Sequence, residues 1–288
     1  MYLKPISTAT HKGARPYQED RFCTVSCEHG MLLAVFVTSL LANFIAPASY
    51  ATQFRDSPNV GSSWKFPLGT DELGRDRFSR LIYGTRVSLL LGPAAALLST
   101  LIAAVIGGAA GYIGGSAEQL AMSATDLFLS LPWFFLLLMA RAMLPLNAGT
   151  WSSVIITFAL LGLLGWPATA RVACAGAKSL RESDVILQAR ASGCHGLRLV
   201  MVHVVPNLAP TLFAQFWILI PVFIIGEANL GILGLGVAEP LPSWGNLLRE
   251  LGDYTVIMSN PWSLAPAALL LLVMSCFQIT LSRKEHSV

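Results

Sequence analysis

The sequence predicts an all-α membrane protein with about six transmembrane helices, and two observations support this. First, 54% of the 288 residues are hydrophobic and only 12% are charged, whereas a soluble domain carries about 25% charged residues. Second, the apolar residues gather in six segments of about the length that an α-helix needs to cross a bilayer. In chain order, these segments cover residues 31–50, 88–113, 121–144, 151–171, 208–236 and 262–282.

A polar head precedes the first apolar segment. That segment starts at Met31 and is about as long as a full membrane span, longer than the apolar core of a cleavable signal peptide. We therefore expect residues 1–30 to form a tail in the cytosol. Residues 31–66 should supply an uncleaved first transmembrane helix and an outer loop.

Charged and apolar residues alternate at near-helical spacing just before the second apolar segment. Residues 71–86 place Leu73, Phe78 and Ile82 among several acidic and basic side chains. This pattern predicts an amphipathic helix that lies on the membrane surface and leads into the second span.

The second segment carries a row of small residues. Gly107, Gly111 and Gly115 recur every fourth residue, and Ala103 extends the row. On a helix, such a row is a smooth stripe that lets another backbone approach closely. The stripe predicts helix packing, either within this chain or at a seam with another subunit, and the spacing does not choose between the two.

Lysine and arginine residues indicate the orientation, because they favour the cytosolic side of a membrane. With both termini in the cytosol, the inner segments carry eleven of these residues and the outer segments carry eight. This orientation places residues 172–207 on the cytosolic side. It also places Arg141 near the outer surface, toward which we expect its long side chain to extend.

The loop at residues 172–207 predicts two short helices around a sharp turn. Ser179 can cap a helix that starts at Leu180, and Gly193 permits the turn. A second helix should run from about Gly196 to Pro206. Such a hairpin can present a small face to a groove on a partner, although a passive surface hairpin is the commoner case.

One acidic residue interrupts the fifth apolar segment. Glu227 lies at membrane depth, where a carboxylate is costly and faces either a cavity or a partner group. Gly231, Gly234 and Gly236 follow closely and weaken a straight helix. These four residues are candidates for a pore or gate, while the alternatives are a hydrogen bond to a neighbouring helix and a plain turn.

The sequence contains few signs of an enzyme. It has no phosphate-binding G-x-x-x-x-G-K-[ST] loop, no H-E-x-x-H and no G-x-S-x-G. Its five cysteines and five histidines lack the spacing of metal ligands, so we expect no metal site and no cofactor bound by this chain. The net charge of +3 argues against nucleic acid.

From about Phe66 onward, three groups of motifs occur in an order that is similar to one known family. These are residues 67–76 (PLGTDELGRD) with 79–89 (SRLIYGTRVSL), then Gly165-Trp166-Pro167, Arg171, residues 179–182 (SLRE), Gly193, His203 and Pro206-Asn207, and finally Glu227-Ala228, residues 233–237 (LGLGV) and 242–246 (PSWGN). Together they resemble the second, C-type permease subunit of ATP-binding-cassette (ABC) importers for dipeptides, oligopeptides and nickel. One departure is that Leu187 and Gln188 stand where the family's cytoplasmic loop begins with Glu-Ala.

The resemblance implies the type I ABC importer transmembrane fold for residues 67–288, in a multi-pass protein of the prokaryotic plasma membrane. It implies half of a pore for peptides or a related small solute such as nickel. The loop at residues 180–206 would couple to the ATPases. The residues implied in that coupling are Ala189, Arg190, Ala191, Gly193, His203 and Pro206.

The resemblance also implies the partners of the chain. They are a second homologous permease, two ABC ATPases that bind ATP and Mg²⁺, an extracytoplasmic solute-binding protein and the lipid bilayer. ATP hydrolysis would take place on the partner subunits, so this chain would be non-catalytic.

Two other functions are weighed against this one. An autonomous secondary transporter or channel predicts ionisable residues along several spans, and Glu227 is nearly alone. The head segment at residues 13–22 resembles the N-terminal strand of PP2C-type phosphatases, which favours a membrane-tethered phosphatase. That enzyme also needs an Asp-Gly-His-Gly element and clustered acidic metal ligands, which the sequence lacks.

Overall fold

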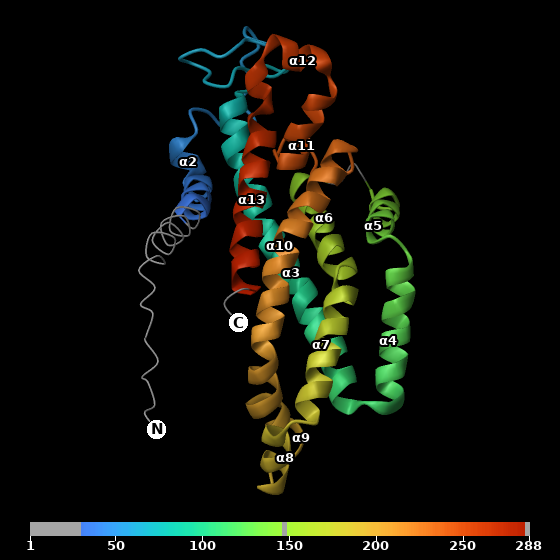
Figure 1. Cartoon of the computed structure of the whole chain (residues 1–288). Coiled ribbons are helices and arrows are strands. Elements are labelled where there is room, and N and C mark those ends of the chain that lie inside the picture. Colours follow the sequence, from blue (N-terminus) through green and yellow to red (C-terminus); the bar gives the residue numbers. More distant parts are fainter. Residues whose placement is uncertain (1–29, 146–148, 286–288) are drawn as a thin grey trace, which may run out of the picture.

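A computed structural model describes residues 30–145 and 149–285. The predicted tail at residues 1–30, including the segment at 13–22, lies outside the described residues except for Gly30. The described chain is helical, and its only β-type pairings are two isolated bridges. It forms an elongated bundle with the short helices α8 and α9 at one end and α12 at the other (Figure 1). We refer to these as the α8 end and the α12 end.

The helical elements follow one another along the chain with few long connections. They are Gly30–Leu40, α2 (Ala42–Ile45), α3 (Arg77–Ile113), α4 (Gly115–Ser130), α5 (Trp133–Ala142), α6 (Thr150–Leu164), α7 (Trp166–Arg181), α8 (Asp184–Ala191), α9 (Gly196–Leu199), the π-helical turn η1 (Val200–Val204), α10 (Val205–Ile232), α11 (Trp244–Arg249), the 3₁₀ turn η2 (Glu250–Gly252), α12 (Tyr254–Ser259), the 3₁₀ turn η3 (Pro261–Leu264) and α13 (Ala265–Glu285).

Four helical stretches in the described residues are long and apolar enough to cross a membrane. They are Arg77–Ile113, Thr150–Arg181, Val200–Ile232 and Pro261–Thr280. The pair α4 and α5 passes the same test when it is taken as one span, but it is bent by 79°. These helices confirm the predicted all-α membrane fold.

The third predicted span, residues 121–144, is broken in the middle. Pro132 lacks a backbone N–H and disfavours the helical conformation of the residue before it. Leu131 accordingly adopts an extended conformation (φ −96°, ψ 137°), and α4 ends there. The first predicted span is also interrupted. Its second piece, α2, stops at Ile45, because Ala46 precedes Pro47 and is extended as well (φ −70°, ψ 126°).

The predicted surface helix at residues 71–86 is wrong. Helix α3 is one continuous helix from Arg77, and residues 71–76 form a turn followed by the two bridge positions Arg75 and Asp76. Asp76 determines where the helix begins, because its carboxylate accepts a hydrogen bond from the backbone N–H of Ser79 at 2.9 Å, as an N-cap does. The amphipathic pattern therefore belongs to the first turns of the second span.

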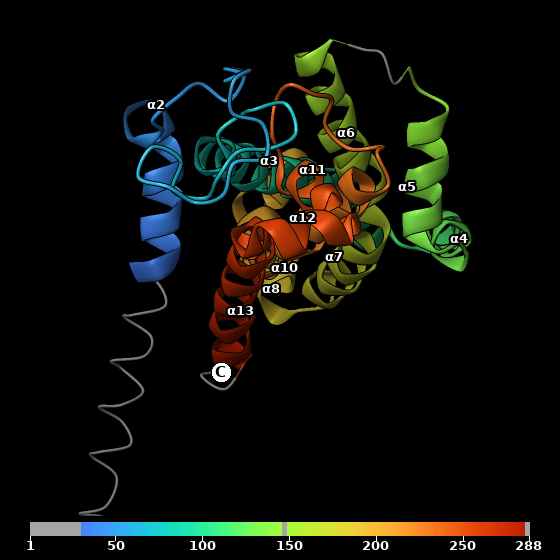
Figure 2. The ribbon, with the colours of Figure 1, turned by 90° about the horizontal axis from the view of Figure 1, so that it is seen from above.

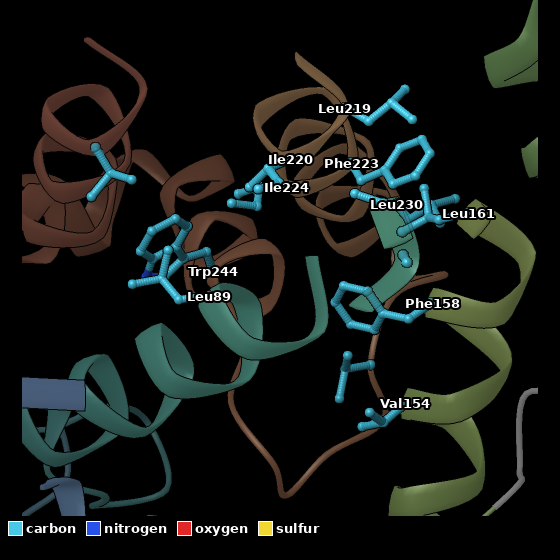
Figure 3. Close-up of a cluster of buried hydrophobic side chains, with 14 of the residues drawn as sticks. Leu89, Val154, Phe158, Leu161, Leu219, Ile220, Phe223, Ile224, Leu230 and Trp244 are labelled. Carbon is cyan, nitrogen blue, oxygen red and sulfur yellow. The ribbon is translucent and has the colours of Figure 1, made fainter. Parts of the chain in front are cut away.

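The core of the bundle forms around α3. Buried side chains from α3, α6, α10 and α11 converge there, as Figure 3 shows for Leu89, Phe158, Phe223 and Trp244. When the bundle is viewed from above, α2 and the α4–α5 pair lie on opposite sides of this group (Figure 2). The core therefore fixes α3, α6, α10 and α11 relative to one another.

Candidate functional site

A helical hairpin forms the α8 end of the bundle. Helix α7 continues to Arg181, so the prediction that Ser179 caps a helix starting at Leu180 is wrong. The chain breaks two residues later instead. Ser183 is extended (φ −75°, ψ 151°) and precedes α8, and its hydroxyl donates to the carbonyl of Leu180 at 2.6 Å. The hairpin therefore begins four residues after the position that the sequence indicates.

The turn after α8 is built around Gly193. This residue has a φ of +82°, a conformation that other L-residues rarely adopt. Its N–H donates to the carbonyl of Arg190, and the N–H of Cys194 donates to that of Ala189, both at 3.0 Å. These two bonds form a Schellman motif, the common end of a helix at a glycine. The structure thus places the predicted turn at Gly193.

The inner face of α8 packs on the rest of the hairpin. Ile186 and Ala189 are buried together with Leu199 and Val204, and Tyr112 at the end of α3 packs against them. The guanidinium of Arg190 lies 5.9 Å from the ring centroid of Tyr112. In contrast, Val185, Leu187, Ala191 and Gly193 are exposed. The hairpin therefore has one face fixed to the bundle and one free face.

The second arm of the hairpin does not stop at Pro206. Helix α9 continues through the π-helical turn η1 into α10, and Pro206 lies in the first turn of α10. Pro206 has no backbone N–H, and it directly follows the π-helical turn, where the regular helical hydrogen-bond pattern is already altered. His203 lies in η1, and its carbonyl accepts from the side-chain amide of Asn207 at 2.6 Å. A push on the hairpin would therefore act directly on the long helix α10.

Two glycines of the small-residue row bring α3 against α7. A Cβ atom at Gly107 would lie 2.1 Å from the carbonyl oxygen of Ala170, and one at Gly111 would lie 2.2 Å from that of Cys174. The stripe thus packs within this chain. The prediction that Gly115 belongs to this stripe is wrong. Helix α3 ends at Ile113, and Gly115 begins α4 with a φ of +62° and open space beside it.

The carboxyl group of Glu227 lies inside the chain. Its side chain is 0% exposed, and one oxygen is 3.4 Å from the hydroxyl of Ser88 on α3. The α10 backbone at Glu227 also closely approaches Gly245 on α11. Glu227 lines neither of the two cavities at the α12 end of the bundle, so the interpretation of Glu227 as a pore-lining residue has no cavity to support it. The other interpretation, a hydrogen bond to a neighbouring helix, fits its burial beside Ser88.

The three glycines after Glu227 shape the end of α10. Gly231 contacts the backbone of Gly245, since a Cβ atom there would lie 2.4 Å from the Cα of Gly245. Gly234 has a φ of +76° and forms a second Schellman motif, with the N–H of Leu235 donating to the carbonyl of Leu230 at 2.8 Å. Gly236 folds back onto Gly231. A turn, not a re-entrant break, explains these glycines.

An ion-pair network that the sequence did not indicate lies at the α12 end. Glu239, in the loop after α10, accepts from Arg75 at 2.6 Å and from Arg80 at 2.9 Å. Arg75 also pairs with Asp71 at 2.7 Å. Burial alone raises the pKa of Glu239, but the two arginines outweigh it and hold that pKa below its usual value. Only proximity in the fold brings these groups together.

Two neighbouring cavities lie beside this network. The larger, of about 420 Å³, is lined by charged groups that include Asp71, Arg75, Arg77 and Glu250. The smaller, of about 130 Å³, is lined by Arg141 and the loop after α10. Glu239, Asn246 and Arg249 line both cavities. The α12 end is therefore hollowed and highly charged.

The expectation that Arg141 extends toward the outer surface of the membrane is wrong. Its side chain does not extend to the surface but is only 1% exposed. One nitrogen, Nη2, lies 3.2 Å from the hydroxyl of Ser153 and 3.5 Å from the carbonyl oxygen of Gly236. The hydroxyl of Ser153 on α6 and the carbonyl of Gly236 in the loop after α10 draw the guanidinium inward. In the described residues, no group of three or more His, Cys, Asp or Glu residues could hold a metal ion.

These features define a polytopic membrane protein with a helical hairpin at one end of its bundle and a charged, hollowed surface at the other. Residues 100–282 match the model of a protein family described as the binding-protein-dependent transport system inner membrane component. This match covers more than half of the chain and includes α6 to α11. The chain belongs to this family and is therefore a permease component of a binding-protein-dependent transport system.

Curated relatives agree with this assignment. The chain is 35% identical over 257 residues to the di/tripeptide transport system permease protein DppC of Pseudomonas aeruginosa, covering 87% of this chain and 82% of that protein. It is 30% identical to the dipeptide transport system permease protein DppC of Bacillus subtilis, covering 86% and 76%. It is 28% identical to the oligopeptide transport system permease protein OppC of the same organism, covering 86% and 79%.

Proposed function

We propose that this chain is the C-type permease subunit of an ABC importer that carries dipeptides or short oligopeptides across the prokaryotic plasma membrane. The single observation that carries the solute class is the similarity to relatives whose names specify dipeptide, di/tripeptide and oligopeptide transport. Nickel and other small solutes are the alternatives within the same family. The chain would supply half of the pore, and a second homologous permease the other half.

The hairpin of α8, α9 and η1 is the proposed contact with the ATPases. Its free face presents Ala191 and Gly193, while Ala189 and Ile186 fix the opposite face to the bundle. Because η1 continues into α10 without a break, a rigid push on the hairpin would be carried into a transmembrane helix. ATP binding on the partner would then favour one conformation of the pore over the other.

This assignment implies an orientation. The ATPases are cytosolic, so the α8 end would face the cytosol and the α12 end would face the extracytoplasmic side. The charged cavities at the α12 end would then face the solute-binding protein. Both termini would lie in the cytosol, in agreement with the excess of lysine and arginine in the inner segments. The chain itself would have no catalytic residues and bind no ATP, metal or nucleic acid.

Co-purification is the first test of the partners. The tagged chain is extracted from native membranes in a mild detergent, and the proteins that accompany it are identified by mass spectrometry. We expect a homologous permease and two P-loop ATPases. A chain that is recovered alone, under conditions that keep known complexes intact, would favour an autonomous transporter or channel. Uptake of labelled dipeptide by the reconstituted complex then tests the solute.

A further inference from the structure

The guanidinium of Arg141 is a buried charge without a counter-ion in the part of the chain that the structure describes. Its Nη2 has the neutral partners Ser153 and Gly236, but Nε and Nη1 have no hydrogen-bond partner, although the side chain is 1% exposed. A charge removed from water without a partner is costly, more so in a membrane protein. An anion bound next to this guanidinium would offset that cost.

The neighbouring cavity has the volume and the charge to hold an anion. It has a volume of about 130 Å³, about four times the share of one water molecule in liquid. Arg141 lines it together with Arg249, which is exposed and forms no ion pair with any described residue. Glu239 is the one acidic residue that lines this cavity. Both carboxylate oxygens of Glu239 already pair with Arg75 and Arg80. The charges left over in the cavity are therefore positive.

We propose that Arg141 and Arg249 form a carboxylate-binding subsite, which takes the terminal carboxylate of the transported solute at the α12 end of the pore. Arginine is well suited to this role, because its planar guanidinium matches the geometry of a carboxylate. Arg249 is exposed and Arg141 is buried, so the cavity that both residues line offers the carboxylate one accessible and one enclosed guanidinium. Asn246, which lines the same cavity, donates to the carbonyl of Val237 at 2.7 Å and so holds the loop that forms one wall.

The occupant follows from the access to Arg141. Because Arg141 is buried within this single chain, a carboxylate can reach it only through a cavity of limited volume. A short peptide can enter such a space with its free terminus, whereas a side chain held on a neighbouring subunit has less freedom to do so. This inference rests on the proposed function, since every dipeptide and oligopeptide with a free terminus carries this group.

The test uses the complete complex in proteoliposomes, with ATP and an excess of loaded binding protein. The variants are Arg141→Gln, Arg141→Lys and Arg249→Gln, and the control is Arg171→Gln, which removes an arginine that pairs with Asp126 in this chain. Two quantities are measured, namely uptake of labelled alanyl-alanine and ATP hydrolysis stimulated by the binding protein. We expect both glutamine variants at the subsite to lower uptake about tenfold while hydrolysis stays close to wild type. Arg141→Lys should recover part of the uptake, and Arg171→Gln should leave it unchanged.

Binding is tested directly with the purified complex, without binding protein. Alanyl-alanine at millimolar concentration should raise the apparent melting temperature of the wild type, whereas its C-terminal amide should not. The Arg249→Gln variant should lose this shift. Because Arg249 is exposed, its substitution should not disturb the fold. The Arg249→Gln variant therefore tests the subsite even if Arg141→Gln fails to assemble.

Several outcomes would overturn the subsite. Normal uptake in both glutamine variants would do so, as would a loss of hydrolysis in proportion to uptake, or the absence of a melting shift in the wild type. Loss of the second permease from the Arg249→Gln complex would assign the carboxylate to that subunit instead. Failure of the wild-type complex to take up any peptide is a different result, because it contradicts the proposed function itself.

Discussion

A Cβ atom at Gly107 would lie 2.1 Å from the carbonyl oxygen of Ala170, so α3 and α7 meet backbone to backbone. Gly111 repeats this contact one turn further along, against Cys174. Small residues at four-residue spacing are the usual means by which membrane helices approach so closely. Here the two glycines hold α3 and α7 of one chain together.

Substitution at this contact gives a sharp prediction. Gly107→Ala should destabilise the protein by about 1–3 kcal/mol, because the added methyl group forces the two backbones apart. The measurement is the free energy of unfolding in a mild detergent. Gly108→Ala is the matched control, since its methyl group would meet only the side chain of Leu208 at 3.5 Å, an ordinary contact. Equal effects of the two substitutions would contradict the packing that we describe.

The turn at Gly193 gives a prediction about coupling. Gly193→Pro should disrupt it, because proline fixes φ near −65° and has no N–H for the bond to Arg190. We expect the variant to insert in the membrane and keep its bundle but to lose most ATP-driven uptake. Gly193→Asn is the control, since asparagine adopts positive φ more readily than other residues. Full uptake by the proline variant would argue against a coupling role for the hairpin.

A buried hydrogen bond joins α11 to α3. The indole Nε1 of Trp244, which is fully buried, donates to the hydroxyl of Thr85 at 3.0 Å. Thr85→Val leaves this donor buried without an acceptor, which costs about 1–3 kcal/mol. We expect a corresponding drop in the free energy of unfolding. Thr85→Ser keeps the hydroxyl and should retain most of the stability, and a serine variant as unstable as the valine variant would show that the lost methyl group matters more.

The network around Glu239 predicts a dependence on pH. Its pKa is lower in the folded protein than in the unfolded chain, where a glutamate titrates near pH 4.3. The ionised carboxylate therefore stabilises the folded protein at pH values above that point. This contribution is lost as the pH falls through the folded-state pKa.

The measurement is the apparent melting temperature of the wild type and Glu239→Gln from neutral pH downward. At neutral pH, the variant should melt at a lower temperature, and the difference should shrink below about pH 4.3 as the wild-type carboxylate becomes protonated. Glu72→Gln is the control, because Glu72 is exposed and forms no ion pair with a described residue. A difference that grows on acidification would have the wrong sign for a carboxylate paired with Arg75 and Arg80.

Local features of the fold followed well from the sequence. The apolar segments indicated the membrane bundle because burial in lipid depends on composition over about 20 residues. Gly193 indicated the turn because few other residues adopt its φ. The predicted ends of helices were less reliable, as the N-cap of α8 shows. Both Ser179 and Ser183 are suitable N-cap residues, and only the continuation of α7 to Arg181 excludes the first.

The sequence by itself determined that this protein is a membrane permease of a known family, with a helical hairpin outside its bundle. Composition and periodicity indicate the membrane bundle and the hairpin, because both depend on residues that are close in the chain. The family follows from the resemblance of the motifs and of their order between residues 67 and 246. Only the tertiary structure decided the roles of the charged residues. For Glu227 the sequence left a pore-lining role and a hydrogen bond to a neighbouring helix open, and the structure buries it beside Ser88. Arg141 was expected to reach the membrane surface, and it is buried inside the chain. Glu239 meets Arg80 across 159 residues, and such partners are chosen by packing, which no local pattern records.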